Sequence, residues 1–578
     1  MKKEKIILGL TCFMHDASAC IIKDNKLIAF AEEERFNYEK HSGQFPKNAI
    51  QYCLDVANIR KNELTDIAFY FNLKKCLVSY LIKNNPLALL YNFDIFKRKR
   101  FFYEALWLTK LYINIALVKK FLGNENIKIH FVDHHKCHAW YGIYSSRLES
   151  GIVLSNDSMG EDISTLGLSF DLSYPNKKNF KVLLKQDDPN SLGYLYGAVT
   201  EFLGYKRGDG EGKVMALASF GTNKYLDYFE EKIFFQNNGK FSIDKSLVID
   251  RSFKPQGARL ANDFFRKFGE PKTKEEEFTQ HHFDIAYALQ NITERLLDHQ
   301  VNYISNISNC SNIIFTGGVA QNSVANGIIS NKYPSIRFIV PPIPHDAGCS
   351  IGAAIAISEK LYQIMPEKTE TAFLGEKFSD KQIIEILENS KIAYKSKNNI
   401  VDFMVEELSS GKVIAIFRKE MEGGPRALCH RSIIADPSFK NMLEHLNKRV
   451  KFREYFRPYG GFMLKEDVPH VLEYKNKYIE GPYMSFVYSV RPEWQNRIPS
   501  LVHVDKTCRI QIIPSNGDQI LLTLLKNYKE KTGIPLLINT SFNIRGLPIC
   551  RSPQDALSAF YSSSIDTLIF NDRIIIKK

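Results

Sequence analysis

The sequence lacks paired cysteines, long apolar runs and repeats, and each absence excludes a class of protein. Its 10 cysteines are scattered singly, with no Cys-x-x-Cys pair, so neither a disulfide framework nor a zinc knuckle is expected. Reduced thiols are typical of the cytosol, and we therefore expect a cytoplasmic protein. No apolar stretch reaches the length of a membrane-spanning helix, so no membrane span is expected. The chain shows neither an internal repeat nor a low-complexity tract.

The composition is that of a globular protein with an excess of positive charge. Its 578 residues, 44% of them hydrophobic, suffice for two or more domains with full cores. The formal net charge of +13 favours anionic partners such as nucleotides, nucleic acid or an acidic membrane surface. A basic run at residues 97–100 precedes residues 101–122, which we interpret as an amphipathic helix packed on the core, with a membrane-surface role as the alternative.

Two histidines four residues apart are the first candidates for a functional site. His134 and His138 follow a strand-like segment at residues 127–132, and Asp133 stands where the N-cap of a helix is expected. On a helix both imidazoles project from one face and can reach a single metal ion. Asp346, in a loop farther along the chain, is the candidate third ligand. On the sequence alone, two packed or solvent-facing histidines explain the pair equally well.

Three strand-to-loop junctions recur in the first two thirds of the chain. Strands are predicted at residues 6–9, 151–155 and 313–316, and each runs into small residues with free backbone amides. Such loops hold phosphate and ribose groups. The first two junctions open hairpins, and the third enters a helix through Gly317 and Gly318. This order favours a two-lobed nucleotide-binding domain of the kind found in sugar kinases and actin.

A second domain is predicted from residue 369, because polar residues of low helix propensity interrupt a helix there. The chain would thus divide into residues 1–368 and 369–578. Cations gather in the second range beside glycine and proline, at Arg426, Arg431, Lys451, Arg453, Arg457 and Arg509. Arginine makes bidentate bonds to phosphate, so a cleft lined by several of them would suit a polyanion. Surface ion pairs with Glu422, Asp436 and Glu454 are the alternative.

A third group of polar residues follows an apolar run at residues 534–538. Asn539, Ser541 and Asn543 would place amides and a hydroxyl at a strand end, where they suit a small carbonyl or phosphoryl ligand. A hydrogen-bonded turn explains them nearly as well.

Ordered motifs along nearly the whole chain resemble the O-carbamoyltransferase family, which includes nodulation-factor, cephem and aminoglycoside carbamoyltransferases. The motifs lie at residues 15–19, 32–36, 134–139, 211–218, 317–322, 346–348, 424–428, 431–432, 453–458 and 539–543. The resemblance implies an α/β (α+β) protein: a Kae1-like domain of the actin-like ATPase type, which transfers the carbamoyl group, followed by a YrdC-like domain. The YrdC-like domain would make carbamoyladenylate from carbamoyl phosphate and ATP with Mg²⁺.

The resemblance also implies roles for individual residues. It makes His134, His138 and Asp346 the expected ligands of a divalent metal, with Fe²⁺ the expected ion. His15 is the candidate general base, because an ordinary histidine pKa of about 6.5 suits proton transfer; a hydrogen-bonding role is the alternative. The residues expected in catalysis are His15, Asp16, Lys213, Arg426, Arg431 and Arg457. The residues expected to bind nucleotide are Asp157, Gly160, Gly317, Gly318, Asn322, Lys451, Arg453, Arg509, Asn539, Ser541 and Asn543.

Four positions depart from the family pattern. Ser158 and Cys429 replace usual glycines, Glu420 stands where an arginine is common, and Leu547 replaces a usual glutamate. These changes leave a non-catalytic nucleotide-binding scaffold as one alternative. Carbamoylation of tRNA or of a protein is another; no RNA-reading motif supports it, and no nucleic-acid partner is expected. The preferred acceptor is a hydroxyl of a small, sugar-containing metabolite, and a homodimer stays open.

Overall fold

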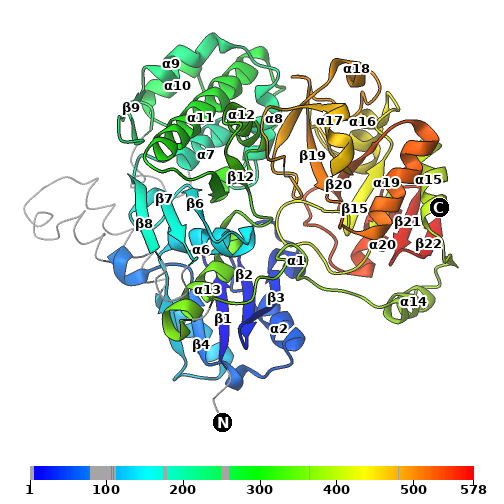
Figure 1. The fold of residues 1–578 in the computed structure, drawn as a ribbon, viewed down its shortest axis with the longest axis horizontal. Coiled ribbons are helices and arrows are strands. Elements are labelled where there is room, and N and C mark those ends of the chain that lie inside the picture. The colour runs from blue at the N-terminus through cyan, green and yellow to red at the C-terminus, as the bar shows by residue number, and fades with distance from the viewer. Residues whose placement is uncertain are drawn as a thin grey trace, which may run out of the picture. The chain divides into compact units, whose positions relative to one another are not determined.

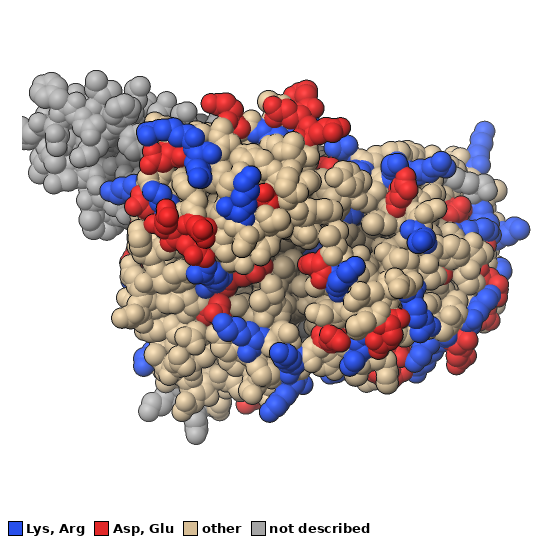
Figure 2. Space-filling model, turned by 90° about the horizontal axis from the view of Figure 1, so that it is seen from above, with Lys and Arg blue, Asp and Glu red and all other residues tan. Residues whose placement is uncertain are grey.

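The computed structural model describes residues 5–77, 106, 109, 112–173, 179–248, 260–363, 365–479 and 481–577. The basic run at residues 97–100 and most of residues 101–111 lie outside the described residues, whereas residues 112–122 are helical. Within the described ranges, no helix is both long and apolar enough to cross a membrane. On the face shown in Figure 2, basic and acidic side chains are interspersed, so the positive net charge is not gathered there into one patch.

The chain divides into two compact units, each built from more than one stretch. The first unit comprises Met1–Glu33, His41–Gln321 and Ile343–Thr369; the second comprises Glu34–Lys40, Asn322–Pro342 and Glu370–Lys578. The main break therefore lies one residue from the predicted position. Two short stretches of the predicted first domain, however, belong with the second unit.

The first unit contains two mixed sheets (Figure 1). One has the strand order β3-β2-β1-β4-β5, in which β1 pairs antiparallel with β2 and parallel with β4. Its strands are β1 (Ile6–Thr11), β2 (Ser18–Lys23), β3 (Lys26–Glu32), β4 (Asp66–Phe69) and β5 (Lys128–Phe131). The other sheet runs β11-β6-β7-β8 within this unit. These strands are β6 (Ser150–Asn156), β7 (Ile163–Asp171), β8 (Asn179–Asp187) and β11 (Asn312–Thr316). A separate two-stranded sheet pairs β9 (Ile233–Phe235) with β10 (Phe241–Ile243).

Helices α6 (His134–Ser146) and α13 (Cys349–Tyr362) pack against each other and position the candidate site. Glycine permits the close approach: a Cβ at Gly352 would overlap the carbonyl oxygen of Cys137 on α6, and one at Gly9 would overlap that of Ser350. The N-terminus of α13 is thereby held beside α6 and β1. Further helices of this unit include α2 (Lys47–Val56), α7 (Leu192–Phe202), α8 (Glu211–Ala218), α9 (Leu226–Glu230), α10 (Asn262–Phe268) and α11 (Gln280–Asn306).

The second unit is built on a ten-stranded sheet with the order β13-β22-β21-β14-β15-β20-β16-β19-β18-β17. Its strands are β13 (Lys395–Ser396), β14 (Ile414–Phe417), β15 (Arg431–Ala435), β16 (Gly460–Leu464), β17 (Leu472–Glu473), β18 (Val487–Val490), β19 (Thr507–Ile513), β20 (Leu536–Ser541), β21 (Thr567–Phe570) and β22 (Ile574–Lys577). Helices of this part are α14 (Asp380–Asn389), α15 (Val401–Ser409), α16 (Met442–His445), α17 (Val468–Val471), α18 (Pro492–Gln495), α19 (Gln519–Thr532) and α20 (Pro553–Tyr561).

Both additional stretches of the second unit make specific contacts within it. The stretch that holds α1 (Glu34–Asn37) donates a hydrogen bond from Arg35 to the Gly424 carbonyl over 2.7 Å. The other stretch holds α12 (Ser323–Lys332) and β12 (Arg337–Ile339), and α12 packs on β18. A Cβ at Gly327 would overlap the Val487 carbonyl oxygen, so glycine is required where α12 meets β18.

The predicted strands and helices are largely present. The strands expected at residues 6–9, 151–155 and 313–316 are β1, β6 and β11. In the second unit, β20 ends at Ser541, so Asn539 and Ser541 lie within its last three residues, at the predicted strand end. All 10 cysteines are free thiols, as their scattered spacing predicted.

Candidate metal and anion sites

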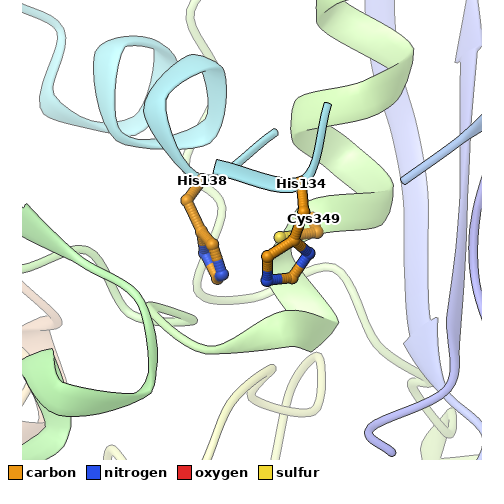
Figure 3. Close-up of side chains that lie close together, drawn as sticks. All are labelled: His134, His138 and Cys349. Carbon is orange, nitrogen blue, oxygen red and sulfur yellow. The ribbon is translucent and has the colours of Figure 1, made fainter. Parts of the chain in front are cut away.

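The two imidazoles of the predicted metal site lie together on α6. His134 and His138 are buried, with 1% and 0% of their surface exposed, and their ring centroids are 4.7 Å apart. Figure 3 shows both rings extending side by side from the helix. His135, on another face, contacts Ser155 Oγ at 2.9 Å and the Ile163 carbonyl at 3.1 Å, and these contacts give it a structural role.

Two carboxylates face these imidazoles from different elements. Asp346, just before α13, brings Oδ1 to 3.6 Å from His134 Nε2 and 3.5 Å from His138 Nε2. Asp157, in the loop after β6, brings Oδ2 to 3.3 Å from His138 Nε2. Ligand atoms from all four residues lie within 4.8 Å of one another. Donors bound about 2.1 Å from a tetrahedral ion are about 3.4 Å apart, so the spacing fits one divalent ion.

Unsatisfied polar atoms give a second indication of a cation. Both nitrogens of His138 and Oδ1 of Asp346 are buried without a hydrogen-bond partner. Leaving such atoms unpaired costs about 1–3 kcal/mol each, and a metal ion would satisfy them. The chemistry of the donors agrees, because imidazole and carboxylate together suit Fe²⁺ or Zn²⁺.

Charge interactions inside the cluster shift the pKa values of its members in opposite directions. Burial lowers the pKa of His134 to about 4. Burial would also lower the pKa of His138, but the nearby carboxylates of Asp157 and Asp346 raise it to about 9. For Asp157 burial would raise the pKa, yet the nearby imidazole of His138 holds it well below the usual range. The carboxylate of Asp157 is therefore ionised and available to a cation.

A thiol lies beside the same imidazoles. Cys349, the first residue of α13, places Sγ within 4.8 Å of ligand nitrogens of His134 and His138 (Figure 3). Burial raises the pKa of this thiol well above the ordinary value. Asp346 and Asp157 form their four-membered cluster with the histidines without Cys349. The carboxylates are thus the stronger ligand candidates.

Asp133 is at the N-cap of α6, as predicted, but another residue makes the capping hydrogen bond. Asp133 occupies the N-cap position, but its side chain makes no capping hydrogen bond. Glu161, from the loop between β6 and β7, accepts the His134 amide hydrogen bond instead, at 3.0 Å. The Asp133 carboxylate pairs with Asn72 at 2.8 Å and with Lys136 at 3.2 Å. A residue distant in sequence can supply a cap, and no local pattern marks Glu161 for this role.

The loop between β1 and β2 brings His15 to the metal cluster. His15 Nε2 lies 3.7 Å from Asp346 Oδ2, and His15 Nδ1 lies 2.9 Å from Asp16 Oδ2. Burial would lower the pKa of His15, but the charges of Asp346 and Asp16 and the Asp16 hydrogen bond raise it to about 10. Asp16 therefore orients the imidazole whose other nitrogen faces a predicted metal ligand.

The other predicted residues of the first unit have mixed placements. Gly318 donates its amide to Asp157 Oδ2 over 2.8 Å, and Gly317 has φ +86 where a Cβ would overlap the Asn156 carbonyl. A Cβ at Gly160 would lie 2.8 Å from the His135 ring. Lys213 pairs with Asp209 at 2.9 Å. The loops after β6 and β11 are thus joined at Asp157, next to the donor cluster.

Asn322 does not belong to the first unit, although the predicted loop that precedes it does. Its side chain caps α12 by accepting a hydrogen bond from the Ala325 amide over 3.0 Å. This contact gives Asn322 a structural role, which the sequence alone did not distinguish from nucleotide binding.

In the second unit, four arginines form a cluster of like charges. Burial and the charge of Arg457 lower the pKa of Arg426 to about 10, and burial also lowers that of Arg453 to about 10. Burial, followed by the charges of Arg426, Arg453 and Arg457, lowers the pKa of Arg509 well below its usual value. Arg509 Nε is buried without a hydrogen-bond partner.

Few carboxylates offset this charge. Arg457 lies 3.6 Å from Glu454 Oε2, and Arg453 donates to Asn447 Oδ1 over 2.8 Å. Across the described ranges, neither Arg426 nor Arg509 has a carboxylate within ion-pair distance. Glu422, one of the partners considered for a surface ion pair, instead accepts backbone hydrogen bonds from residues 428, 430 and 431 at 2.8–2.9 Å. The cluster is therefore suited to a polyanion.

The polar residues around this cluster hold its loops. Lys451 Nζ is buried and donates to the Ser541 carbonyl over 2.7 Å and to the Asn543 carbonyl over 2.9 Å. Burial lowers the pKa of Lys451 well below its ordinary value. Asn539 donates to the Ala427 carbonyl over 3.2 Å, while its own Oδ1 is buried and unpaired. These contacts fix the loop that carries Arg426 against β20.

Arg431 is placed apart from the other predicted catalytic arginines. Its guanidinium is buried, stacks 3.7 Å from the Phe417 ring centroid and donates to the backbone carbonyls of Arg418, Glu376 and Lys419. All of these contacts are internal, so the structure gives Arg431 a role in holding the chain together. A sequence pattern that contains Arg426 and Arg431 cannot separate the two roles.

The departures from the family pattern have physical consequences that differ in size. Cys429 has φ +71, a left-handed conformation that explains why glycine is usual there, yet it is buried and receives a hydrogen bond from Asn539. Glu420 pairs with Lys377 at 2.9 Å. Leu547 is 38% exposed. Ser158 donates its amide to Asp157 Oδ1. Each substitution is thus accommodated in the structure.

Comparison with known proteins gives the family. Residues 6–355 match the family described as "Carbamoyltransferase N-terminus", and residues 405–577 match "Carbamoyltransferase C-terminus". The chain is 32% identical over 580 residues to the nodulation protein NolNO of Sinorhizobium fredii (strain NBRC 101917 / NGR234), covering 98% of this chain and 79% of that protein. It is 31% identical over 617 residues to protein sll1178 of Synechocystis sp. (strain ATCC 27184 / PCC 6803 / Kazusa), covering 99% of this chain and 96% of that protein.

A solved structure of full-length HypF in a phosphate- and nucleotide-bound form is 13% identical, covers 63% of this chain and 57% of that chain, and has a TM-score of 0.37, too low to establish a shared fold. The two family matches, by contrast, span most of the sequence and fall on both units. The chain therefore belongs to the carbamoyltransferase family and is a transferase.

Proposed function

We propose that this carbamoyltransferase is ATP-dependent and transfers its carbamoyl group to a hydroxyl of a small, sugar-containing metabolite. The second unit would form carbamoyladenylate from carbamoyl phosphate and ATP, and the first unit would carry out the transfer. The observation that carries the proposal is the arginine cluster of the second unit, in which Arg426 and Arg509 lack any carboxylate partner within the described ranges. Unbalanced guanidinium charge of this kind is suited to ATP and carbamoyl phosphate.

The proposed first reaction consumes carbamoyl phosphate, water and ATP. Hydrolysis of carbamoyl phosphate releases phosphate and carbamate; a carbamate oxygen then bonds to the α-phosphorus of ATP, and pyrophosphate leaves. Negative charge concentrates on the phosphoryl oxygens during this displacement, and Arg426, Arg453 and Arg509 would stabilise it. The carbamoyl group becomes a mixed anhydride with AMP, which is a good leaving group.

In the second reaction, the acceptor oxygen bonds to the carbamoyl carbon. The bond between that carbon and the phosphate oxygen of the anhydride breaks, and AMP leaves. His134, His138 and Asp346 would hold a divalent ion, with Asp157 as a further donor. Such an ion supplies positive charge and Lewis acidity for the phosphate and carbonyl oxygens.

His15 is the residue that we propose holds or accepts the acceptor's proton. Its raised pKa of about 10 depends largely on the charge of Asp346. A cation at Asp346 would offset that charge and lower the His15 pKa towards the range in which a general base is effective.

The experiment that tests the proposal separates the two reactions. Purified protein is given ATP, Mg²⁺ and carbamoyl phosphate without an acceptor, and pyrophosphate is measured; we expect its release to depend on carbamoyl phosphate. Absence of pyrophosphate would instead support a nucleotide-binding scaffold. In a second step, isotope-labelled carbamoyl phosphate and a metabolite extract are added. Mass spectrometry of the products would then identify the labelled carbamate ester and thereby the acceptor.

A further inference from the structure

The loop that carries His15 is held by a second loop about 25 residues away in sequence. Phe13 N–H donates to the Gly43 carbonyl over 2.8 Å, and Ala17 N–H donates to the Ser42 carbonyl over 2.7 Å. A Cβ at Gly43 would overlap the Met14 carbonyl oxygen, so only glycine permits this approach. Residues 41–43 thus form a backbone clasp on residues 13–17.

Side chains extend the clasp to the candidate site. Three imidazoles lie near the two carboxylate oxygens of Asp16: Oδ2 lies 2.9 Å from His15 Nδ1, whereas Oδ1 lies 2.7 Å from His41 Nδ1 and 4.0 Å from His345 Nε2. The other nitrogen of His41 lies 3.7 Å from Asp209 Oδ1, and Asp209 Oδ2 is 2.9 Å from Lys213. A continuous chain of contacts therefore connects Lys213 with His15.

Backbone conformation indicates that this arrangement is held under strain. Asp16 has φ +52 and His41 has φ +54, which is uncommon for residues other than glycine. Such conformations cost about 1–3 kcal/mol and persist where surrounding contacts enforce them, often near active sites. Asp16 and His41 contact each other directly, so their hydrogen bond helps to enforce both conformations.

We propose that His41 is a positioning residue for carbamoyl transfer. It holds one oxygen of Asp16, so that the other oxygen keeps the His15 imidazole turned towards Asp346. The inference rests on the proposed function, because it assigns His15 a contact with the reacting groups. Without His41, only His15 among the imidazoles would lie at hydrogen-bond distance from Asp16, because His345 Nε2 is 4.0 Å away, and the carboxylate could rotate and lose the orientation of His15. A displacement of about 1 Å at a reacting group can cost about 100-fold in rate.

A pair of substitutions separates the two contacts of His41. In His41→Asn the amide nitrogen replaces Nδ1 and can still donate to Asp16, whereas in His41→Gln it replaces Nε2 and reaches towards Asp209. We expect His41→Gln to lower the kcat of carbamoyl transfer roughly 10- to 100-fold, with the acceptor KM and pyrophosphate release unchanged. His41→Asn should keep most of the transfer rate. Metal content should equal that of the unaltered protein in both.

The chain offers a matched control for these variants. His130 Nε2 lies 2.7 Å from Asp66 Oδ1 in another imidazole–carboxylate pair of the same unit, and His130→Gln should leave transfer unchanged. Hydrogen exchange of residues 13–17 should stay slow in both His41 variants, because the backbone bonds of the clasp remain. Equal rates for the two variants, whether both high or both low, would overturn the inference. So would fast exchange of that loop in both.

Failure of the proposed function has a different signature. In that case the unaltered protein itself would form no carbamate ester, and the role assigned to His41 would fall with it. If the unaltered protein and His41→Gln both transferred the carbamoyl group at the same rate, the proposed function would stand and only the role of His41 would be wrong.

Discussion

The two candidate sites differ in how their charges are balanced. In the first unit, each imidazole of the donor cluster faces a carboxylate at 3.3–3.6 Å. In the second unit, Arg426, Arg453 and Arg509 have mainly other arginines as charged neighbours. A balanced set of donors with unsatisfied atoms is suited to one small cation, because the ion completes its coordination. An unbalanced set of cations is suited to a larger anion, which supplies the missing charge.

The largest expected effect comes from removing a donor. His138→Ala should weaken metal binding by more than about 100-fold, since loss of even an outer-sphere partner of a metal site typically costs 10- to 100-fold. Carbamoyl transfer should be lost, whereas pyrophosphate release by the second unit should remain. Elemental analysis of the purified protein and the two partial reactions measure these outcomes. Loss of both reactions in this variant would contradict the division of labour between the units.

The converse change removes one unbalanced cation. Arg426→Ala should lower the kcat of pyrophosphate release about 100- to 1,000-fold, as expected when a donor to a developing anion is removed. Metal content should stay normal. Because Arg426 lies near like charge and has no described carboxylate partner, thermal stability should be unchanged or slightly higher. A clear fall in Tm would show that the Arg426 side chain stabilises the folded protein.

A pair of variants compares donors within the first site. Asp346→Asn should lower metal content strongly, because Asp346 Oδ1 lies 3.5–3.6 Å from both imidazoles. Cys349→Ser should leave metal content nearly unchanged, since Cys349 lies outside the four-membered cluster of histidines and carboxylates. Both are measured by metal titration of the chelated protein. If Cys349→Ser lost most of its metal and Asp346→Asn did not, the thiol and not the carboxylate would be the metal ligand.

The smallest effect concerns a paired arginine of the second unit. Arg418 lies 3.1 Å from Asp518; burial would raise the pKa of Asp518, but the charge of Arg418 lowers it to about 2. A carboxylate whose pKa is lowered in the folded state stabilises the protein at pH values above its ordinary pKa. This contribution is lost as the pH falls from about 4 to about 2. Asp518→Asn should therefore lower the free energy of unfolding at pH 7 by about 1–2 kcal/mol.

The same variant should differ little from the unaltered protein near pH 2. Urea denaturation at both pH values measures the difference. A constant difference across this range would mean that the charge of Asp518 does not carry the effect.

Local patterns predicted the elements that carry the sites better than the contacts between them. The i,i+4 spacing of His134 and His138 placed both imidazoles on one helix face, and apolar runs located β1, β6 and β11. The sequence does not show which distant residues complete these elements. Asp157, which was predicted to bind nucleotide, faces His138 because the loop after β6 returns to α6, and no local pattern predicted that contact. Glu161 caps α6 for the same reason.

Within the second unit, one short motif contains two arginines with different roles. Arg426 and Arg431 belong to one short stretch of the resemblance, yet Arg426 lies in the loop before β15, whereas Arg431 is the first residue of that buried strand and donates to backbone carbonyls. The sequence does not show where the loop ends and the strand begins, so it does not separate the two arginines. Sequence reasoning identifies the cations, while tertiary structure decides which of them can meet a ligand.

The discontinuous second unit limits how the protein can be dissected. A cut at residue 369 would leave α1 and α12 on the amino-terminal fragment, without Gly424 and β18, which they contact in the intact chain. The carboxyl-terminal fragment would in turn expose the apolar surface that α12 covers, and would be prone to aggregate. Isolated halves are therefore poor reagents for assigning the partial reactions. Point substitutions in the full-length polypeptide avoid that problem.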